Sequence, residues 1–170
     1  MNEDKTLERV GYVDTSHGVD WLKKAEILQK ELFEIIDEEK HVRAIVIEDI
    51  ASKFSGGRSS AKTIIALARF NAVATYILYS NFEVVPIHYN VIKARNLAGC
   101  KVPRGVNTKE FVLNRIMELY PEIVWPRMKK KDAIDKKAYD MADSVIVALA
   151  HLAQSKVDSD DRKRNSKSAA

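Results

Sequence analysis

The sequence predicts an α/β domain, and three observations carry that prediction. Residues 42–47 consist almost entirely of Val, Ala and Ile, a pattern typical of a strand that is covered on both faces. Residues 20–40 repeat apolar side chains at helical spacing, with charged residues on the other face. Residues 61–80 are a second helical stretch, rich in Ala and Leu. A buried strand between two long helices is typical of a sheet covered by helices.

Length and composition define the broad class of protein. The chain has 170 residues, which fits one domain with a sizeable core. Hydrophobic residues make up 46% and charged residues 31%, an ordinary composition for a soluble globular protein. No apolar run approaches the length needed to cross a bilayer, and we expect no signal peptide. The single cysteine, Cys100, excludes an internal disulfide and a cysteine-rich zinc site, and we interpret it as a small apolar side chain rather than a nucleophile. A chain with a single cysteine fits a reducing compartment, so we expect the protein to be cytoplasmic.

The remaining elements follow from periodicity and turn signals. We expect strands at residues 7–13 and 82–85, helices at residues 108–120 and 140–154, a short helix within residues 88–99, and irregular chain at residues 101–106 and 121–131. Thr15 or Ser16 is expected to cap the first helix, and Thr108 the helix that it begins. The helix at residues 61–80 is apolar on most sides and should pack centrally. Residues 155–170 mix charge with Ser and Ala, and we predict a disordered polar tail.

Three acidic residues stand where such a sheet can hold chemistry. Glu48 comes directly after the buried strand, and ligands gather at the carboxyl ends of parallel strands. Asp140 and Asp143 are three residues apart on the last helix, so their side chains point the same way. Two carboxylates on one face repel each other unless a cation lies between them. A set of oxygen ligands without a histidine cluster suits Mg²⁺ or Mn²⁺ rather than zinc.

Each acid also has a purely structural interpretation. Glu48 and the neighbouring Asp49 can simply begin a loop. Asp140 and Asp143 can favour the helix dipole or cap the helix, and their spacing alone fits that interpretation better. A separate acid at a strand end favours the metal site, because a pair of ions there would activate water and stabilise the leaving oxygen of a phosphodiester. His151, two turns beyond Asp143, can orient a ligand or lie at the edge of the core.

Basic residues crowd the approach to the last helix. The net charge of +4 does not by itself predict nucleic-acid binding. The crowded cations are Arg127, Lys129, Lys130, Lys131, Lys136 and Lys137. Cations beside carboxylates fit a polyanion that is brought to a metal site, although a solvated loop would look the same. Lys130 is a candidate DNA contact, as is Arg58 in a glycine-rich loop that lacks the Gly-Lys-Ser/Thr ending of a Walker loop.

Four motifs resemble a known family. They are Ile45-Val46-Ile47-Glu48-Asp49, Lys62 with Leu67-Ala68-Arg69-Phe70-Asn71-Ala72-Val73, Val91-Ile92-Lys93 with Gly99, and Tyr139-Asp140-Met141-Ala142-Asp143 continuing to His151. Together they resemble the RuvC-type Holliday junction resolvases, the phage-like and divergent members most closely. The resemblance spans roughly residues 7–153, and the closing Asp-x-x-Asp helix is its most specific part.

The resemblance implies an RNase H-like fold over residues 1–154, with a mixed sheet flanked by helices. The family cuts branched DNA as a homodimer by Mg²⁺-assisted phosphodiester hydrolysis. Glu48, Asp140 and Asp143 match three of its four metal ligands. Lys93 and Lys109 fall where the family keeps cations near the scissile phosphate. Phe54 lies near where the family can place an aromatic wedge at the junction centre.

The fourth ligand of the family, an Asp on its first strand, is not found. That strand carries Gly-Ile-Asp followed by Gly or Ser ahead of a hairpin, whereas residues 7–13 match the third strand of the family better. We therefore expect the first two strands to be absent. Asp14 imitates the missing motif, but a helix follows it at once. A longer chain, a strand from a partner or a second copy, or loss of cleavage would each account for the departure.

The sequence thus predicts a metal-dependent endonuclease that resolves branched DNA. The first alternative is a catalytically inactive protein of the same fold that binds DNA junctions. The second is a structural or assembly protein that uses the fold only as a scaffold, which an absence of salt-dependent DNA binding would favour.

Overall fold

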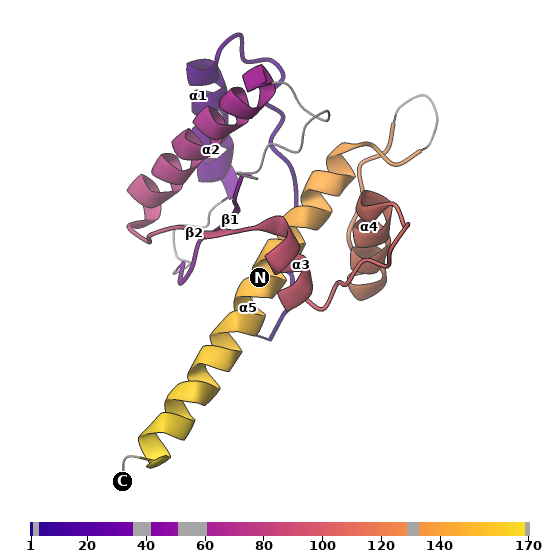
Figure 1. Ribbon diagram of the computed structural model, residues 1–170. Coiled ribbons are helices and arrows are strands. Elements are labelled where there is room, and N and C mark those ends of the chain that lie inside the picture. The colour runs from indigo at the N-terminus through magenta and orange to yellow at the C-terminus, as the bar shows by residue number, and fades with distance from the viewer. Residues whose placement is uncertain (2–3, 36–41, 51–60, 129–132, 169–170) are drawn as a thin grey trace. The chain divides into compact units, whose positions relative to one another are not determined.

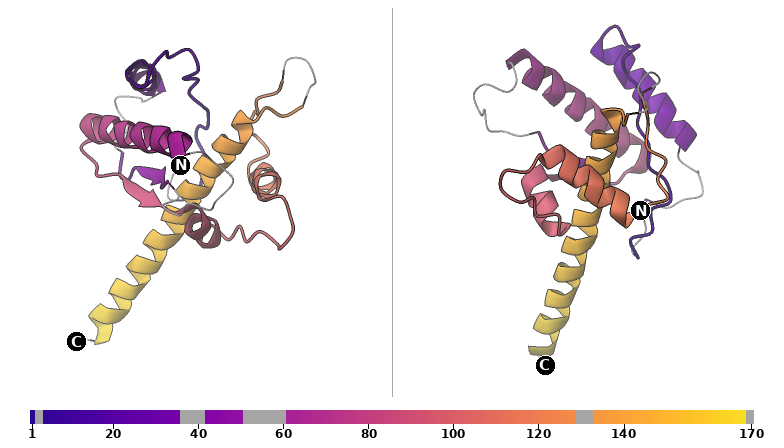
Figure 2. Two further views of the ribbon diagram at one scale, coloured as in Figure 1. Left: turned by 45° about the horizontal axis from the view of Figure 1, so that its top comes forward. Right: turned by 90° about the vertical axis from the view of Figure 1, so that its right-hand side faces the viewer.

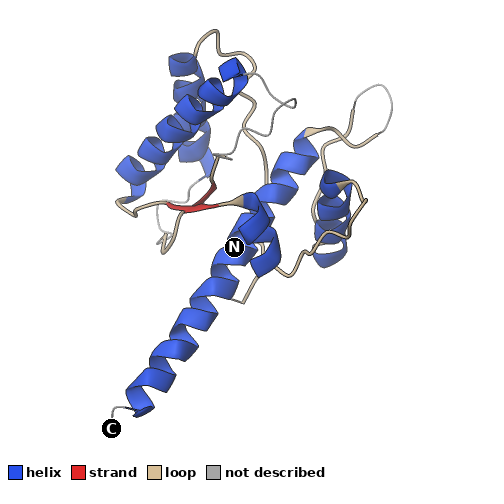
Figure 3. Cartoon of the chain, viewed as in Figure 1, coloured by secondary structure: helices blue, strands red, loops and turns tan. Residues whose placement is uncertain are grey.

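The computed structural model describes residues 1, 4–35, 42–50, 61–128 and 133–168 (Figure 1). The described chain is mostly helical and contains a small parallel sheet of two strands (Figure 3). The elements are α1 (Trp21–Ile35), β1 (Val46–Glu48), α2 (Ala61–Phe82), β2 (Ile87–Tyr89), α3 (Val91–Leu97), α4 (Thr108–Leu119) and α5 (Lys137–Ser168). They divide into two compact units, the strand unit (Val13–Asn90) and the α5 unit (Met1–Tyr12 with Val91–Ala170). The α/β class expected from the sequence is confirmed.

The strand unit is built around the parallel pair β1 and β2. Val46 lies opposite Ile87, and Glu48 lies opposite Tyr89. The ladder continues past both ends of β1, because the Ile87 amide donates to the Ile45 carbonyl and the Asp49 amide to the Tyr89 carbonyl, each at 2.8 Å. Helix α2 is the crossover that a parallel pair requires. The predicted strand therefore exists only over Val46–Glu48, and it ends at Glu48 as expected. It is not buried as predicted, because Val46 and Ile47 are half-buried and Glu48 is exposed.

Two predicted strands are wrong. Residues 82–85 do not form a strand, because α2 runs to Phe82 and Glu83 then leaves the helix with a φ of 54°. The strand follows Pro86 instead, where the Ile87 amide supplies the donor that a proline lacks. Residues 7–13 are irregular, although their alternation partly resembled a strand. Alternation alone is insufficient, since a strand needs a neighbour for its backbone groups.

The helix caps differ from those predicted. Asp20 caps α1, with its Oδ1 accepting from the Lys23 amide at 2.8 Å, in place of Thr15 or Ser16. Asn107 caps α4, with its Oδ1 accepting from the Lys109 amide at 3.1 Å, in place of Thr108. Asp, Asn, Ser and Thr can all cap the N-terminus of a helix. Where several of them lie close together in sequence, the backbone conformation decides which one is the cap.

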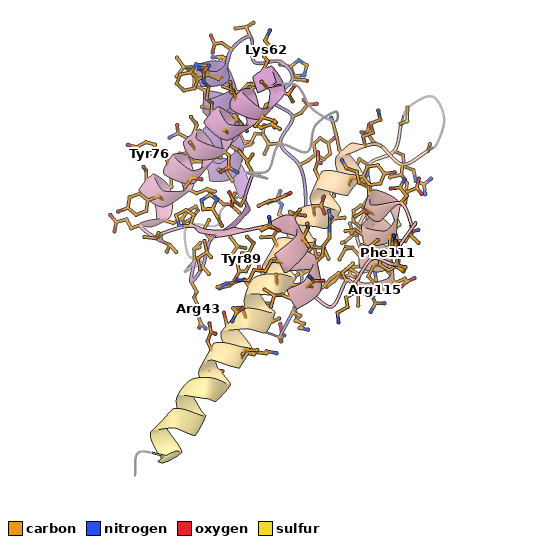
Figure 4. The ribbon with its side chains drawn as sticks, in the orientation of Figure 1. Arg43, Lys62, Tyr76, Tyr89, Phe111 and Arg115 are labelled. Atoms are coloured by element: carbon orange, nitrogen blue, oxygen red, sulfur yellow. The ribbon has the colours of Figure 1, made fainter. Side chains whose placement is uncertain are left out.

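Helix α2 is far more exposed than predicted. Ile77 is its one buried residue, and Tyr76, which projects from the helix surface in Figure 4, is 70% exposed. By length and composition, α2 is also the one described helix that could cross a membrane, which corrects the expectation that no apolar run approaches that length. This test is weak evidence by itself, because soluble core helices also pass it. α1 packs against α2 within the strand unit.

Helices α3 and α4 both pack against α5, and the views in Figure 2 show them along its first half. The α5 unit buries Ala94 of α3, Val112, Leu113 and Ile116 of α4, and Ala138, Met141, Ala142, Val145, Ile146, Val147, Leu149 and Ala150 of α5. The alanines at 94, 138 and 142 are fully buried, and such small side chains allow helix axes to approach closely. The core of this unit is therefore centred on α5.

The last helix is longer than predicted at both ends. It begins at Lys137 rather than Asp140 and runs to Ser168 rather than Gln154, so residues 155–168, predicted as part of a disordered tail, are helical. Its final turns extend past α3 and α4 (Figure 1). Residues 137–168 contain neither Gly nor Pro, and nothing in them stops a helix. The polar composition of residues 155–168 indicates that they contribute little to a core. It does not indicate that they lack helical structure.

The core of the α5 unit gives a stability prediction. Ile116 is 0% exposed, so Ile116→Ala leaves a cavity and should lower the free energy of unfolding by about 2–4 kcal/mol. Leu119, on the same helix, is 44% exposed, and Leu119→Ala should cost less than about 1 kcal/mol. Denaturant unfolding followed by circular dichroism measures both. Equal losses would mean that α4 does not pack through Ile116.

Candidate functional site

An ion pair inside the α5 unit joins Arg95 to Asp143. The Arg95 Nη2 atom lies 3.0 Å from Asp143 Oδ1, a hydrogen-bonding distance. The two side chains are only 16% and 15% exposed. Removing one partner from such a shielded pair leaves a poorly solvated charge, which costs more than the loss of an exposed pair. The contact therefore ties α3 to the second turn of α5.

The helix start explains how the two aspartates differ. Asp135 Oδ1 accepts from the Lys137 amide at 3.0 Å, so this residue caps α5. Asp140 lies in the first turn and is exposed, where the helix dipole favours its charge. Asp143 lies beyond that turn and pairs with Arg95. The capping interpretation of the two predicted acids thus fails for Asp143, and a dipole role fits Asp140 alone.

Both predicted phosphate-binding lysines lie in the α5 unit. Lys93 is exposed on α3, two residues before Arg95. Lys109, in the first turn of α4, has its Nζ 5.8 Å from the centroid of the Tyr139 ring, within the range of a cation–π contact. Tyr139 immediately precedes Asp140, so this contact keeps a lysine beside the start of α5. Arg115 lies further along α4 (Figure 4), where its Nη1 pairs at 3.0 Å with Glu118.

Glu48 belongs to the strand unit. It is exposed at the carboxyl end of β1, and its backbone carbonyl accepts from Asn71 Nδ2 at 2.9 Å, which ties the strand end to α2. Asp14, the alternative acid, is in the same unit, and its Oδ1 accepts from the Ser16 amide at 3.0 Å. That bond makes a local turn. His151, on α5, lies with its Nε2 3.5 Å from Ser155 Oγ.

The structure places some of the predicted site residues in one unit. Asp140, Asp143, Lys93 and Lys109 share the α5 unit, whereas Glu48 lies in the strand unit. Phe54, Arg58 and Lys130 fall outside the described residues. Within the described parts of the chain, no three His, Cys, Asp or Glu side chains form a group that could hold a metal ion. The carboxylate oxygens of Glu48, Asp140 and Asp143 are donor atoms that suit Mg²⁺. The assignment of these residues as metal ligands stays a prediction.

Sequence reasoning missed Arg95 and Asn71. Asn71 is part of a motif that carries the family resemblance, and Arg95 lies between Lys93 and Gly99 of another, but neither was given a role. Asp143, the partner of Arg95, is 48 residues away along the chain. A lone arginine in a short helix offers no signal for such a partner, because the pairing depends on how two helices pack.

Comparison of the chain with models of protein families, with curated proteins and with solved structures finds no match.

Cys100 gives a chemical prediction. The residue is 3% exposed, and burial raises the pKa of its thiol, although Arg95 and Arg115 act in the opposite direction. A raised pKa leaves less thiolate at pH 8, so alkylation should be at least about tenfold slower than for free cysteine. Mass spectrometry of the iodoacetamide reaction, with and without denaturant, measures this. Equal rates in the native and denatured chain would show that Cys100 is accessible.

Proposed function

We propose that this protein is a metal-dependent endonuclease of the RuvC type that resolves branched DNA. The observation that carries the proposal is the set of family-like motifs, above all the strand-end Glu48 followed later by Asp140 and Asp143 on one helix. The local structure agrees with that reading at two points. Glu48 ends a strand that is paired in parallel, and the two aspartates lie on one helix with two candidate lysines in the same unit.

The proposal includes an RNase H-like fold, with a mixed sheet flanked by helices. The β1–α2–β2 segment supports it, because a parallel pair with a helical crossover is a building block of such sheets. The full sheet of the family would need more strands than the described residues contain.

In this proposal Glu48, Asp140 and Asp143 hold Mg²⁺ or Mn²⁺. Bound there, the cation would activate a water molecule and stabilise the leaving oxygen of the phosphodiester. Lys93 and Lys109 bind DNA phosphates near the scissile phosphodiester and offset the negative charge that develops there during cleavage. Action as a homodimer, as in the family, would cut both strands of a junction.

Junction binding without cleavage is the second candidate function. Two observations favour it. The described residues contain no group of three ligand side chains, and Asp143 already pairs with a guanidinium. The basic residues would serve DNA binding in either case, so binding alone does not distinguish the two functions.

Cleavage of a labelled four-way DNA junction tests the proposal. We expect paired nicks with Mg²⁺ or Mn²⁺ and none with a chelator. Asp143→Asn should keep junction binding and lower the cleavage rate by at least about 100-fold, since it removes a charged ligand. Asp158→Asn makes the same change in an exposed acid further along α5 and should cut normally. Tight binding without nicks in the unaltered chain would support the second candidate function, and normal cutting by Asp143→Asn would refute the metal assignment.

Salt dependence tests the DNA contacts. Lys93→Ala should weaken binding to all junction sequences alike and reduce the slope of log K against log salt by about 1, because one phosphate contact is lost. Lys156→Ala removes an exposed lysine of α5 that has no assigned role, and its slope should not change. Fluorescence anisotropy at several salt concentrations measures both variants. An unaltered slope for Lys93→Ala would remove that residue from the interface.

A further inference from the structure

One face of α2 carries apolar side chains that the proposed reaction does not use. Five apolar residues recur there at intervals of three or four, so they lie along one side of the helix. They are Ile65, Ala68, Ala72, Tyr76 and Tyr79, and we call them the α2 stripe. All five are exposed, Tyr76 at 70%, Ile65 at 52% and Tyr79 at 47%. An apolar surface of this kind is typical of a binding face.

Residues outside the stripe hold α2 to the strands. Asn71 Nδ2 donates to the Glu48 carbonyl at the end of β1 at 2.9 Å, and Thr75 Oγ1 lies 3.4 Å from Nε2 of His88 in β2. Ile77 is buried. These contacts keep the middle of α2 against the sheet while the stripe stays exposed. Crossing a membrane would separate α2 from both strands, because the bilayer core admits only helices and closed barrels.

The charged side chains of α2 are all positive. Residues 61–82 contain Lys62 and Arg69 but no Asp or Glu, and both cations are exposed. Lys62 lies three residues before Ile65 and Arg69 four residues after it, so both flank the stripe. Figure 4 shows Lys62 and Tyr76 on this helix. Long cationic side chains can lay their apolar stems on lipid and keep their charges in water.

This combination fits anionic lipid better than a second copy of the chain. Two α2 helices packed through their stripes would bring four cations together, with no acid on either helix to compensate. A surface of anionic lipid attracts the same cations, each of which strengthens binding about fivefold. Tyrosine also suits this boundary, because its ring is apolar and its hydroxyl can stay among the headgroups.

We propose that the α2 stripe is a membrane-docking surface, through which the strand unit binds a bilayer that contains anionic lipid. The helix lies in the plane of the interface, with the stripe toward the acyl chains and Lys62 and Arg69 at the level of the lipid phosphates. It does not cross the bilayer, because Arg69 lies near the middle of α2, where hydrocarbon would make its charge costly. The inference goes beyond the proposed nuclease activity and uses none of its site residues.

Cosedimentation of the full chain with lipid vesicles tests the inference. We expect binding at least about tenfold tighter to an equal mixture of phosphatidylcholine and phosphatidylglycerol than to phosphatidylcholine alone. Tyr76→Ser should weaken binding to the mixed vesicles at least about tenfold, because it removes apolar area that lipid would cover. Arg69→Gln should weaken it about fivefold. The matched controls Val124→Ser and Lys156→Gln change exposed residues of the α5 unit and should bind normally.

Three results of the vesicle assay would overturn the inference. The first is no binding to either kind of vesicle. The second is normal binding by Tyr76→Ser, which would show that charge alone attracts the chain. The third is an equal loss in Val124→Ser, which would show that the effect does not belong to the stripe. Circular dichroism checks the folding of each variant, and Tyr79→Ser repeats the test if Tyr76→Ser does not fold.

A fluorescent label on the stripe separates lipid from other occupants. Ala72→Cys can carry an environment-sensitive dye, because Cys100 is 3% exposed and reacts slowly. We expect the emission to shift to the blue only when mixed vesicles are added. A blue-shifted emission without lipid at every protein concentration would show that the rest of the chain covers the stripe. A shift that grows with protein concentration would show that a second copy covers it, and either result would overturn the inference.

Discussion

The α5 unit depends on one constraint, which is that helix α5 must bury its apolar side chains against α3 and α4. Ala94 and Ala142 are both 0% exposed, so the helices that carry them approach closely. Each lies next to a charged residue in sequence, Arg95 in one case and Asp143 in the other. Close packing of α3 against α5 thus brings Arg95 and Asp143 together, although no local sequence pattern predicts that they pair.

Such a pair carries a cost that limits what the two residues can do. Neither side chain is more than 16% exposed, so water solvates each charge poorly and the partner must compensate. Changes at Asp143 therefore act on stability as well as on any ligand. Asp140, which is exposed one turn earlier, is free of that constraint. The two acids of the Asp-x-x-Asp motif have the same chemistry but different surroundings.

Local signals in the sequence predicted much of the strand unit. The end of the apolar run, Val46–Glu48, is a strand in a parallel pair, and the helix predicted from residue 61 begins at Ala61. Errors arose where a tertiary partner decides the outcome. Residues 7–13 alternate but pair with no strand among the residues that the structure describes, and α2 is apolar but mostly exposed. Capping failed by one residue in α4 because Asn107 and Thr108 are both competent caps.

By itself, the sequence determined the α/β class, the strand end at Glu48 and the placement of Asp140 and Asp143 on one helix. These features depend on periodicity and spacing, which are local properties of the chain. Only the tertiary structure decided that Asp143 pairs with Arg95 and that Lys109 lies beside Tyr139. Those contacts join separate helices, and their geometry depends on how the helices pack.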